Sequence, residues 1–171
     1  VMTTSGPGFT NLITPMLDMT NDSTPGVFIT GQVPLNAIGT NAFQEAPSID
    51  LSKHVTKYST QIKSILDIEK EFDKAFKIAY NGKMGAVHID IPKCVASSSM
   101  PKSDYLEICI SNIENKIKIP SIKNIFNNYD ACFKKTIDII NNSKKPIIYL
   151  GQGCVKEYKL LREFAIAGNI P

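Results

Sequence analysis

DIEKEFDKAFKIAYNGKMGAVHIDIP, residues 67–92, is the stretch that decides the fold, because it joins a helical pattern directly to a strand pattern. The first half predicts a helix that Asp67 caps and that ends near Gly82. Its apolar side chains recur at helical spacing, at Ile68, Phe72, Phe76 and Ala79. The second half, residues 86–91, is a short apolar run that stops at a proline, which is typical of a buried strand.

The same alternation of strand and helix precedes this stretch. Three further segments favour strands, at residues 1–5, 26–30 and 56–62. A helix is predicted from Phe9 onward, with Pro15 either kinking it or setting a late start. Residues 31–48 have no periodicity and predict a long ordered loop. Strands alternating with helices in this order predict an α/β fold, a parallel sheet flanked by helices on both faces.

A second unit is predicted after a Ser- and Lys-rich stretch at residues 96–120. We therefore expect a first domain at residues 1–102, a linker at residues 103–121 and the start of a second α/β domain at residues 122–171. This second domain is expected to open with a helix through Phe126, Tyr129, Phe133, Ile137 and Ile140. The elements predicted after it are a strand at residues 146–150, a turn at 151–153 and a helix at 156–167 that stops at Gly168.

Composition excludes several classes of protein. Of the 171 residues, 43% are hydrophobic and 20% are charged, and the net charge is +3, which is ordinary for a soluble globular chain. Basic and aromatic residues do not interleave as in nucleic-acid-binding proteins, and no apolar run is long enough to span a membrane. The four cysteines lack CxxC spacing, which favours free thiols in a reducing compartment and predicts no metal site. Because the chain opens on a strand pattern without an initiator methionine, we expect a fragment of a longer protein.

Three loops are candidates for a binding site, because ligands of parallel sheets bind at the carboxyl ends of the strands. They are TSGPGFTN at residues 4–11, TGQVPLNAIGTNAFQE at residues 30–45 and Gly-Gln-Gly at residues 151–153. The glycines of the first loop let a ligand approach the backbone beside a helix N-terminus, although a tight turn without a ligand explains them at least as well. Taken alone, the third loop is an ordinary strand-end turn.

The first two loops resemble those of acetolactate synthase catalytic subunits, which are thiamine-diphosphate enzymes. That family carries TSGPGATN, TGQVP, IGTDAFQE and a VDIPKD-like segment, and this chain has TSGPGFTN, TGQVP, IGTNAFQE and IDIPKC in the same order. A single GPG turn is weak evidence, whereas four ordered matches over about ninety residues are specific. A weaker match continues through Lys57, residues 82–85 and residues 149–153.

The resemblance implies a transferase that joins two pyruvates, or pyruvate and 2-oxobutyrate, into a 2-acetyl-2-hydroxy acid with loss of carbon dioxide. This reaction belongs to the biosynthesis of isoleucine, valine and leucine. The implied cofactors are thiamine diphosphate, FAD and Mg²⁺. The first domain would be most of the pyrimidine-binding domain, and the second would begin the central FAD-associated domain.

The resemblance also assigns roles to particular residues. The residues that line the pocket of the thiamine pyrimidine ring are Ser5, Gly6, Pro7 and Gly8. Gln44 is expected beside the cofactor, where an amide both donates and accepts without adding charge. Phe43 is expected as an apolar wall near the reacting carbon, and Lys93 is expected to attract an anionic 2-oxo acid. These three are the candidate catalytic residues, although core packing explains Phe43 and simple solvation explains Lys93 as alternatives.

Two further groups of residues follow from the resemblance. The substrate channel is implied at Pro34, Ala42 and Lys57, together with Lys93. The FAD contacts are implied at Lys83, Gly151, Gln152 and Gly153. Lys83 stands where the family has an arginine, so it keeps the positive charge but loses the planar fork of the guanidinium.

Four positions depart from the family. Asn41 and Cys94 replace aspartates, Gln152 replaces a common glycine, and Phe9 places a bulky ring where a small residue is usual. The catalytic glutamate of the family precedes TSGPG, and the Mg²⁺ ligands belong to a third domain. Neither is expected in this chain, so we expect the isolated chain to be inactive.

The expected partners are 2-oxo acid substrates and a second catalytic subunit in a homodimer or higher oligomer, with a small regulatory subunit left open. Neither nucleic acid nor a membrane is expected, and the expected compartment is bacterial cytoplasm or plastid. Two alternatives stay open. One is another thiamine-diphosphate enzyme of the same fold, such as glyoxylate carboligase, pyruvate oxidase or a 2-oxo acid decarboxylase. The other is a non-catalytic, degenerate paralogue.

Overall fold

The structure, a computed structural model, describes residues 1–105 and 130–171. The chain divides into two compact units, Val1–Ile117 and Lys118–Pro171, and each unit is described by itself. Most of the predicted linker lies outside the described residues, as do Phe126 and Tyr129 of the predicted helix.

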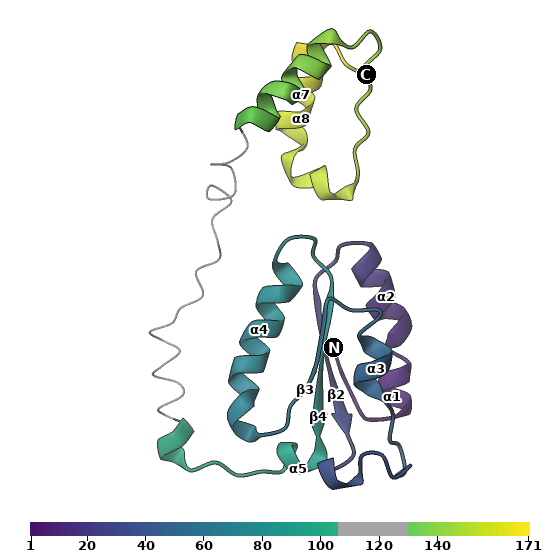
Figure 1. The fold of residues 1–171 in the computed structure, drawn as a ribbon, viewed down its shortest axis with the longest axis vertical. Coiled ribbons are helices and arrows are strands. Elements are labelled where there is room, and N and C mark those ends of the chain that lie inside the picture. The colour runs from purple at the N-terminus through teal and green to yellow at the C-terminus, as the bar shows by residue number, and fades with distance from the viewer. Residues whose placement is uncertain (106–129) are drawn as a thin grey trace. The chain divides into compact units, whose positions relative to one another are not determined.

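The first unit is built on a parallel four-stranded sheet (Figure 1). Its strands are β1 (Met2–Thr3), β2 (Gly26–Gln32), β3 (Tyr58–Gln61) and β4 (Ala86–Pro92). Their order across the sheet is β1-β2-β4-β3, so the two longest strands lie in the middle. This confirms the α/β fold with a parallel sheet that the sequence predicts. The register pairs both Thr30 and Gln61 with Asp90, which puts three polar residues at the carboxyl ends of three adjacent strands.

Helices cover both faces of this sheet (Figure 1). One face carries α4 (Ile68–Tyr80), and the other carries α1 (Pro7–Thr10), α2 (Ile13–Asn21) and α3 (Ser48–Ser52). The apolar side chains accordingly form two clusters. The cluster under α1 and α2 contains Phe9, Leu12, Met16, Phe28, Ala46 and Ala86. The cluster under α4 contains Ile62, Ala75, Ala79, Val87, Ile89 and Val95.

Short helices connect these elements. They are the 3-10 turns η1 (Leu35–Ala37) and η2 (Ile65–Asp67) and the single-turn helix α5 (Lys93–Ala96). Pro15 falls in the first turn of α2, where a missing N–H costs nothing, so the late start is the correct alternative.

The helix α4 differs from its prediction at two points. Ala75 is fully buried, whereas Phe76 is 49% exposed, because a period of 3.6 residues from Ile68 and Phe72 reaches position 75 and turns position 76 outward. Asp67 makes no side-chain cap. The Ser64 hydroxyl instead accepts a hydrogen bond from the Leu66 N–H at 3.3 Å and caps the preceding turn η2.

The second unit contains α7 (Asp130–Asn142), the 3-10 helix η5 (Gln152–Glu157) and α8 (Tyr158–Gly168). The strand predicted at residues 146–150 is wrong, because this segment pairs with no other strand within residues 130–171. Ile147 is 79% exposed and Tyr149 is 96% exposed. β-favouring residues form a strand only where a neighbouring strand accepts their backbone hydrogen bonds.

The end of α8 also differs from its prediction. Asn169, not Gly168, adopts the left-handed conformation, with φ 48°. The Ile170 N–H then donates to the Ala165 carbonyl at 2.9 Å, which closes the helix end and buries the Ile170 side chain. In the part of the chain that the structure describes, no helix is both long and apolar enough to cross a membrane.

Candidate functional site

Two of the predicted loops meet at the carboxyl edge of the sheet in the first unit. Gly6 is buried with φ 55°, and a Cβ built on it would lie 2.8 Å from the Gln44 carbonyl oxygen and 2.9 Å from the Gln44 Cα. Only a glycine permits both this backbone conformation and this approach. The structure therefore brings Ser5–Gly8 and the Phe43–Gln44 turn together, although some forty residues separate them in sequence.

Residues 33–48, called here the 33–48 loop, present the turn that contains Phe43 and Gln44. Asn41 and Gln44 both have positive φ, at 59° and 61°, and the Glu45 carboxylate holds the turn together. Its two oxygens accept hydrogen bonds from the Gly39 N–H at 2.5 Å and the Ala42 N–H at 3.0 Å. The bond from Gly39 is the main reason that the pKa of Glu45 is lowered. Asn41 suits this turn, because asparagine tolerates the left-handed region well.

The side chains at the apex of the turn point away from the protein. Phe43 is 89% exposed, so its alternative role in core packing is excluded within the first unit, and Gln44 is exposed beside it. The bulky Phe9 behaves in the opposite way. Its ring is fully buried and stacks on His88 at a centroid distance of 5.2 Å, so it does not narrow the surface in front of the two loops.

Pro34 and Lys93 lie on the same edge of the sheet. Pro34 immediately precedes η1, and Lys93 is the first residue of α5, directly after β4. The two segments touch where the Leu35 N–H donates to the Cys94 Sγ at 3.4 Å. Lys93 is exposed. The structure thus places Pro34, Ala42 and Lys93 on the carboxyl edge together with Gln44.

Lys57 and Lys83 lie at the opposite, amino edge of the sheet. The Lys57 ammonium donates to the Ile78 and Asn81 carbonyls at the C-terminus of α4, the second bond at 2.7 Å, and burial lowers its pKa. Within the first unit Lys57 therefore acts as a helix cap, and the structure does not bring it together with Pro34 and Ala42. Lys83 is exposed in the turn after α4.

A buried carboxylate lies beneath the two loops. Asp90 is fully buried in β4, and four uncharged groups donate hydrogen bonds to it. Its Oδ1 accepts from the Thr30 hydroxyl at 2.8 Å. Its Oδ2 accepts from Ser48 Oγ at 2.7 Å, Gln61 Nε2 at 2.9 Å and Gln32 Nε2 at 3.3 Å. The carboxylate therefore joins β2, β3, β4 and the beginning of α3 at one point.

The same network reaches His88. The Thr30 hydroxyl donates to Asp90, and the Thr30 oxygen lies 2.8 Å from His88 Nε2. His88 Nδ1 lies 2.8 Å from Ser52 Oγ. Burial lowers the pKa of His88 from 6.5 to about 4, and the nearby Asp90 charge only partly opposes this effect. His88 is thus a neutral, internal residue with no role at the surface.

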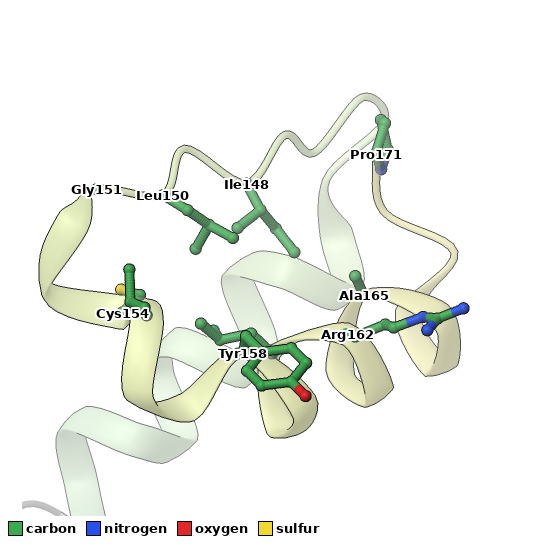
Figure 2. A pocket seen from close by; sticks show the side chains of 10 residues that line it. Ile148, Leu150, Gly151, Cys154, Tyr158, Arg162, Ala165 and Pro171 are labelled. Carbon is green, nitrogen blue, oxygen red and sulfur yellow. The ribbon is translucent and has the colours of Figure 1, made fainter.

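Gly151 of the third loop borders an apolar hollow of about 350 Å³ in the second unit. Figure 2 shows the side chains of Ile148 and Leu150 directed from the extended segment toward Tyr158 of α8. A Cβ built on Gly151 or Gly153 would meet no atom within 4 Å, so open space adjoins both. Cys154, Arg162 and Ala165 also line this hollow. The side chain of Gln152 is not described.

Sequence reasoning missed the residues that support the loops from below. Gln32, Ser48 and Asp90 are buried polar residues, and apart from the bond between Gln32 and its neighbour Val33 their side-chain hydrogen bonds span 14 to 60 positions. A signal was present, because Thr30, His88 and Asp90 are polar residues in otherwise apolar strands. No group of three or more His, Cys, Asp or Glu side chains that could hold a metal ion occurs in residues 1–105 and 130–171.

Comparison with known proteins agrees with this geometry. Residues 1–53 match the family described as thiamine pyrophosphate enzyme, N-terminal TPP binding domain. This range contains both loops at the carboxyl edge.

The whole chain is also similar to longer proteins. It is 37% identical over 183 residues to the mitochondrial acetolactate synthase catalytic subunit of Saccharomyces cerevisiae. This alignment covers 100% of this chain and 25% of the relative. It is 34% identical to the chloroplastic acetolactate synthase of Arabidopsis thaliana and 36% identical to the acetolactate synthase large subunit of Corynebacterium glutamicum, each over 170 residues. These alignments cover 98% of this chain and 24% and 26% of the relatives. The chain therefore spans about a quarter of the length of these proteins.

The contact between Gly6 and Gln44 predicts a large effect of Gly6→Ala. The matched control is Gly82→Ala, since Gly82 also has positive φ, at 62°, but a Cβ there would meet nothing within 4 Å. We expect Gly82→Ala to cost about 1 kcal/mol of stability from backbone strain alone and Gly6→Ala to cost about 3 kcal/mol, because overpacking adds to the strain. Thermal melting of the full-length variants measures both costs. Equal melting temperatures would contradict the contact.

The buried neutral His88 predicts acid sensitivity. Because its pKa is about 4 in the folded state and 6.5 as an unperturbed group, the unfolded state binds more protons between these values. The contribution of neutral His88 to the free energy of unfolding is complete above pH 6.5. It is lost as the pH falls toward 4, and the total loss is about 3 kcal/mol. Melting temperatures from pH 7 to 4 should fall less steeply for His88→Gln than for the wild type. His54→Gln, which changes an exposed histidine, should follow the wild type, and identical slopes for all three would refute the assignment.

Proposed function

We propose that this chain belongs to the thiamine pyrophosphate enzyme family and is a segment of an acetolactate synthase catalytic subunit. The complete protein would join two pyruvates, or pyruvate and 2-oxobutyrate, with loss of carbon dioxide, in the biosynthesis of branched-chain amino acids. The observation that carries the proposal is the direct contact of Gly6 with Gln44, because it assembles the two most specific family motifs on one edge of one sheet.

The residues at this edge fit a thiamine ring. Ser5–Gly8 offer backbone groups next to a helix start, and the Thr3 hydroxyl just before them is the one buried side-chain polar atom in the described residues that lacks a hydrogen-bond partner. Gln44 adds an exposed amide, and Phe43 adds an exposed ring. A planar, polar heterocycle matches this combination of donors, acceptors and apolar surface.

Bound thiamine diphosphate would supply the carbanion chemistry that joins the two oxo acids. The protein side chains would bind, orient and exclude water. Gln44 would hydrogen-bond without adding a charge, and Phe43 would exclude water from one side of the reacting centre. Lys93 would attract the carboxylate of a 2-oxo acid approaching the same edge, and Pro34 and Ala42 would line its path.

An open surface of this kind covers a ligand from one side only. The 89% exposure of Phe43 means that nothing in the first unit lies over it. We therefore propose that a second catalytic subunit supplies the opposite wall, and that the Mg²⁺ ligands and the catalytic glutamate lie in other parts of the complete protein. The relatives' names add the mitochondrion to the compartments expected from the sequence.

The second unit fits a nucleotide cofactor less directly. Open space beside Gly151 and Gly153 would let FAD approach the backbone, and Arg162 lies at the border of the adjoining hollow. Lys83 of the first unit is exposed and retains the positive charge that the resemblance assigns to a FAD contact. We propose FAD as a second cofactor on these grounds.

The proposed activity is tested with the full-length protein, pyruvate, thiamine diphosphate, Mg²⁺ and FAD. Acetolactate should form, and Gln44→Ala should lower kcat/KM about a hundredfold, because it removes a group beside the cofactor. Asn36→Ala, an exposed change in the same loop, is the control and should stay near the wild-type value. Acetoin, acetaldehyde or peroxide without acetolactate would favour another enzyme of the same fold. Absence of any conversion and of thiamine diphosphate binding would favour the degenerate paralogue.

A related prediction concerns the 171-residue chain expressed alone. Because each loop surface is open on one side, we expect the 171-residue chain to bind thiamine diphosphate at least a hundredfold more weakly than the full-length protein. We also expect this short chain to have no activity. Isothermal titration calorimetry measures the difference. Binding of equal strength in the short chain would contradict the proposal that the site is shared between domains.

A further inference from the structure

The 33–48 loop is closed at its base by hydrogen bonds that converge on one carboxylate. Gln32 is the last residue of β2 and Ser48 is the first residue of α3, so they stand at the two ends of the loop. Both donate to the same oxygen, Asp90 Oδ2, Ser48 at 2.7 Å and Gln32 at 3.3 Å. Asp90 itself belongs to β4 and lies 42 positions from Ser48. The two ends of the loop are therefore held by a group that is not part of it, and they also contact each other, because Gln32 Nε2 donates to Ser48 Oγ at 3.2 Å.

The side chain of Gln32 also forms hydrogen bonds with the backbone of the loop itself. Its Nε2 also donates to the Ala46 carbonyl at 2.8 Å, and its Oε1 accepts from the Val33 N–H at 2.9 Å. The ladder between β2 and β4 ends at the pair Gln32–Pro92, so strand pairing fixes no residue beyond it. Ala46 lies two residues from Gln44, whose backbone rests on Gly6. A shift of Gln32 or Ser48 would therefore move the turn against the glycine loop.

We propose that Asp90 is the positioning residue of this site, which sets the place of the 33–48 loop and hence of Phe43 and Gln44 against Ser5–Gly8. The inference rests on the proposed function for its effect on cofactor binding. Asp90 is buried and touches no ligand, so it would act through Gln32 and Ser48 alone. Its other two bonds, from Thr30 and Gln61, lead into the strands β2 and β3.

Because Asp90 accepts separate hydrogen bonds from the loop ends and from the strands, single substitutions can remove one kind of bond at a time. Ser48→Ala removes one tie to the loop, and Thr30→Val removes one bond to the same carboxylate on the strand side, so the second is the matched control. Asp90→Ala removes every hydrogen bond that the carboxylate accepts and leaves only the direct bond from Gln32 to Ser48 between the loop ends. In Asp90→Asn the amide oxygen can still accept from Ser48, while the NH₂ group faces the Thr30 oxygen, which can accept a hydrogen bond from it. Asp90→Asn should therefore retain most of the positioning.

The experiment uses the full-length protein and two readouts. Limited digestion with chymotrypsin reports the mobility of the loop through the rate of cleavage after Phe43, and calorimetry reports the Kd of thiamine diphosphate. We expect Asp90→Ala and Ser48→Ala to be cleaved faster and to bind the cofactor about tenfold more weakly, whereas Thr30→Val and Asp90→Asn should stay within about threefold of the wild type.

The outcomes separate the inference from the proposed function. If Ser48→Ala and Thr30→Val show equal cleavage rates and equal affinities at similar melting temperatures, Asp90 has only a structural role and the inference is overturned. If the wild type binds no thiamine diphosphate, the proposed function fails, and the cleavage rates still decide whether Asp90 holds the loop. Should Asp90→Ala fail to fold, Ser48→Ala against Thr30→Val decides the question.

Discussion

The first unit depends on the burial of one negative charge. A carboxylate inside a protein is costly unless donors surround it, and Asp90 is surrounded by Thr30, Gln32, Ser48 and Gln61. These donors come from β2, β3 and α3, which are separate in sequence. Satisfying this charge therefore requires that the three elements meet at the carboxyl end of β4. The same requirement sets the base of the surface on which a ligand would bind.

The surface above this charge is made of loops, and its chemistry depends on their backbone as much as on their side chains. Gly6 permits a contact that any other residue would prevent, and the Glu45 carboxylate holds the turn that exposes Phe43 and Gln44. A rigid base with exposed side chains suits a binding site whose opposite wall comes from another part of the protein. This agrees with the proposal that other parts of the complete protein close the site.

In the second unit many large apolar side chains are exposed rather than packed against a sheet. Its two longer helices keep large apolar side chains exposed, among them Tyr158 at 61% and Ile166 at 70%, and the extended segment at residues 146–150 has no strand beside it in the part that the structure describes. The apolar hollow between this segment and α8 is a consequence, because side chains that would otherwise pack against a sheet have only each other.

The sequence by itself determined the elements whose signals are local: the strands near residues 26–30 and 86–91, the helix α4, the parallel sheet and the family motifs. Periodicity and turn residues act within a few positions, so one sequence suffices to read them. Tertiary structure alone decided that Lys57 caps α4, that residues 146–150 form no strand, and which donors surround Asp90. Each of these outcomes depends on hydrogen-bond or packing partners distant in sequence, and no local pattern specifies which residues the fold will bring together.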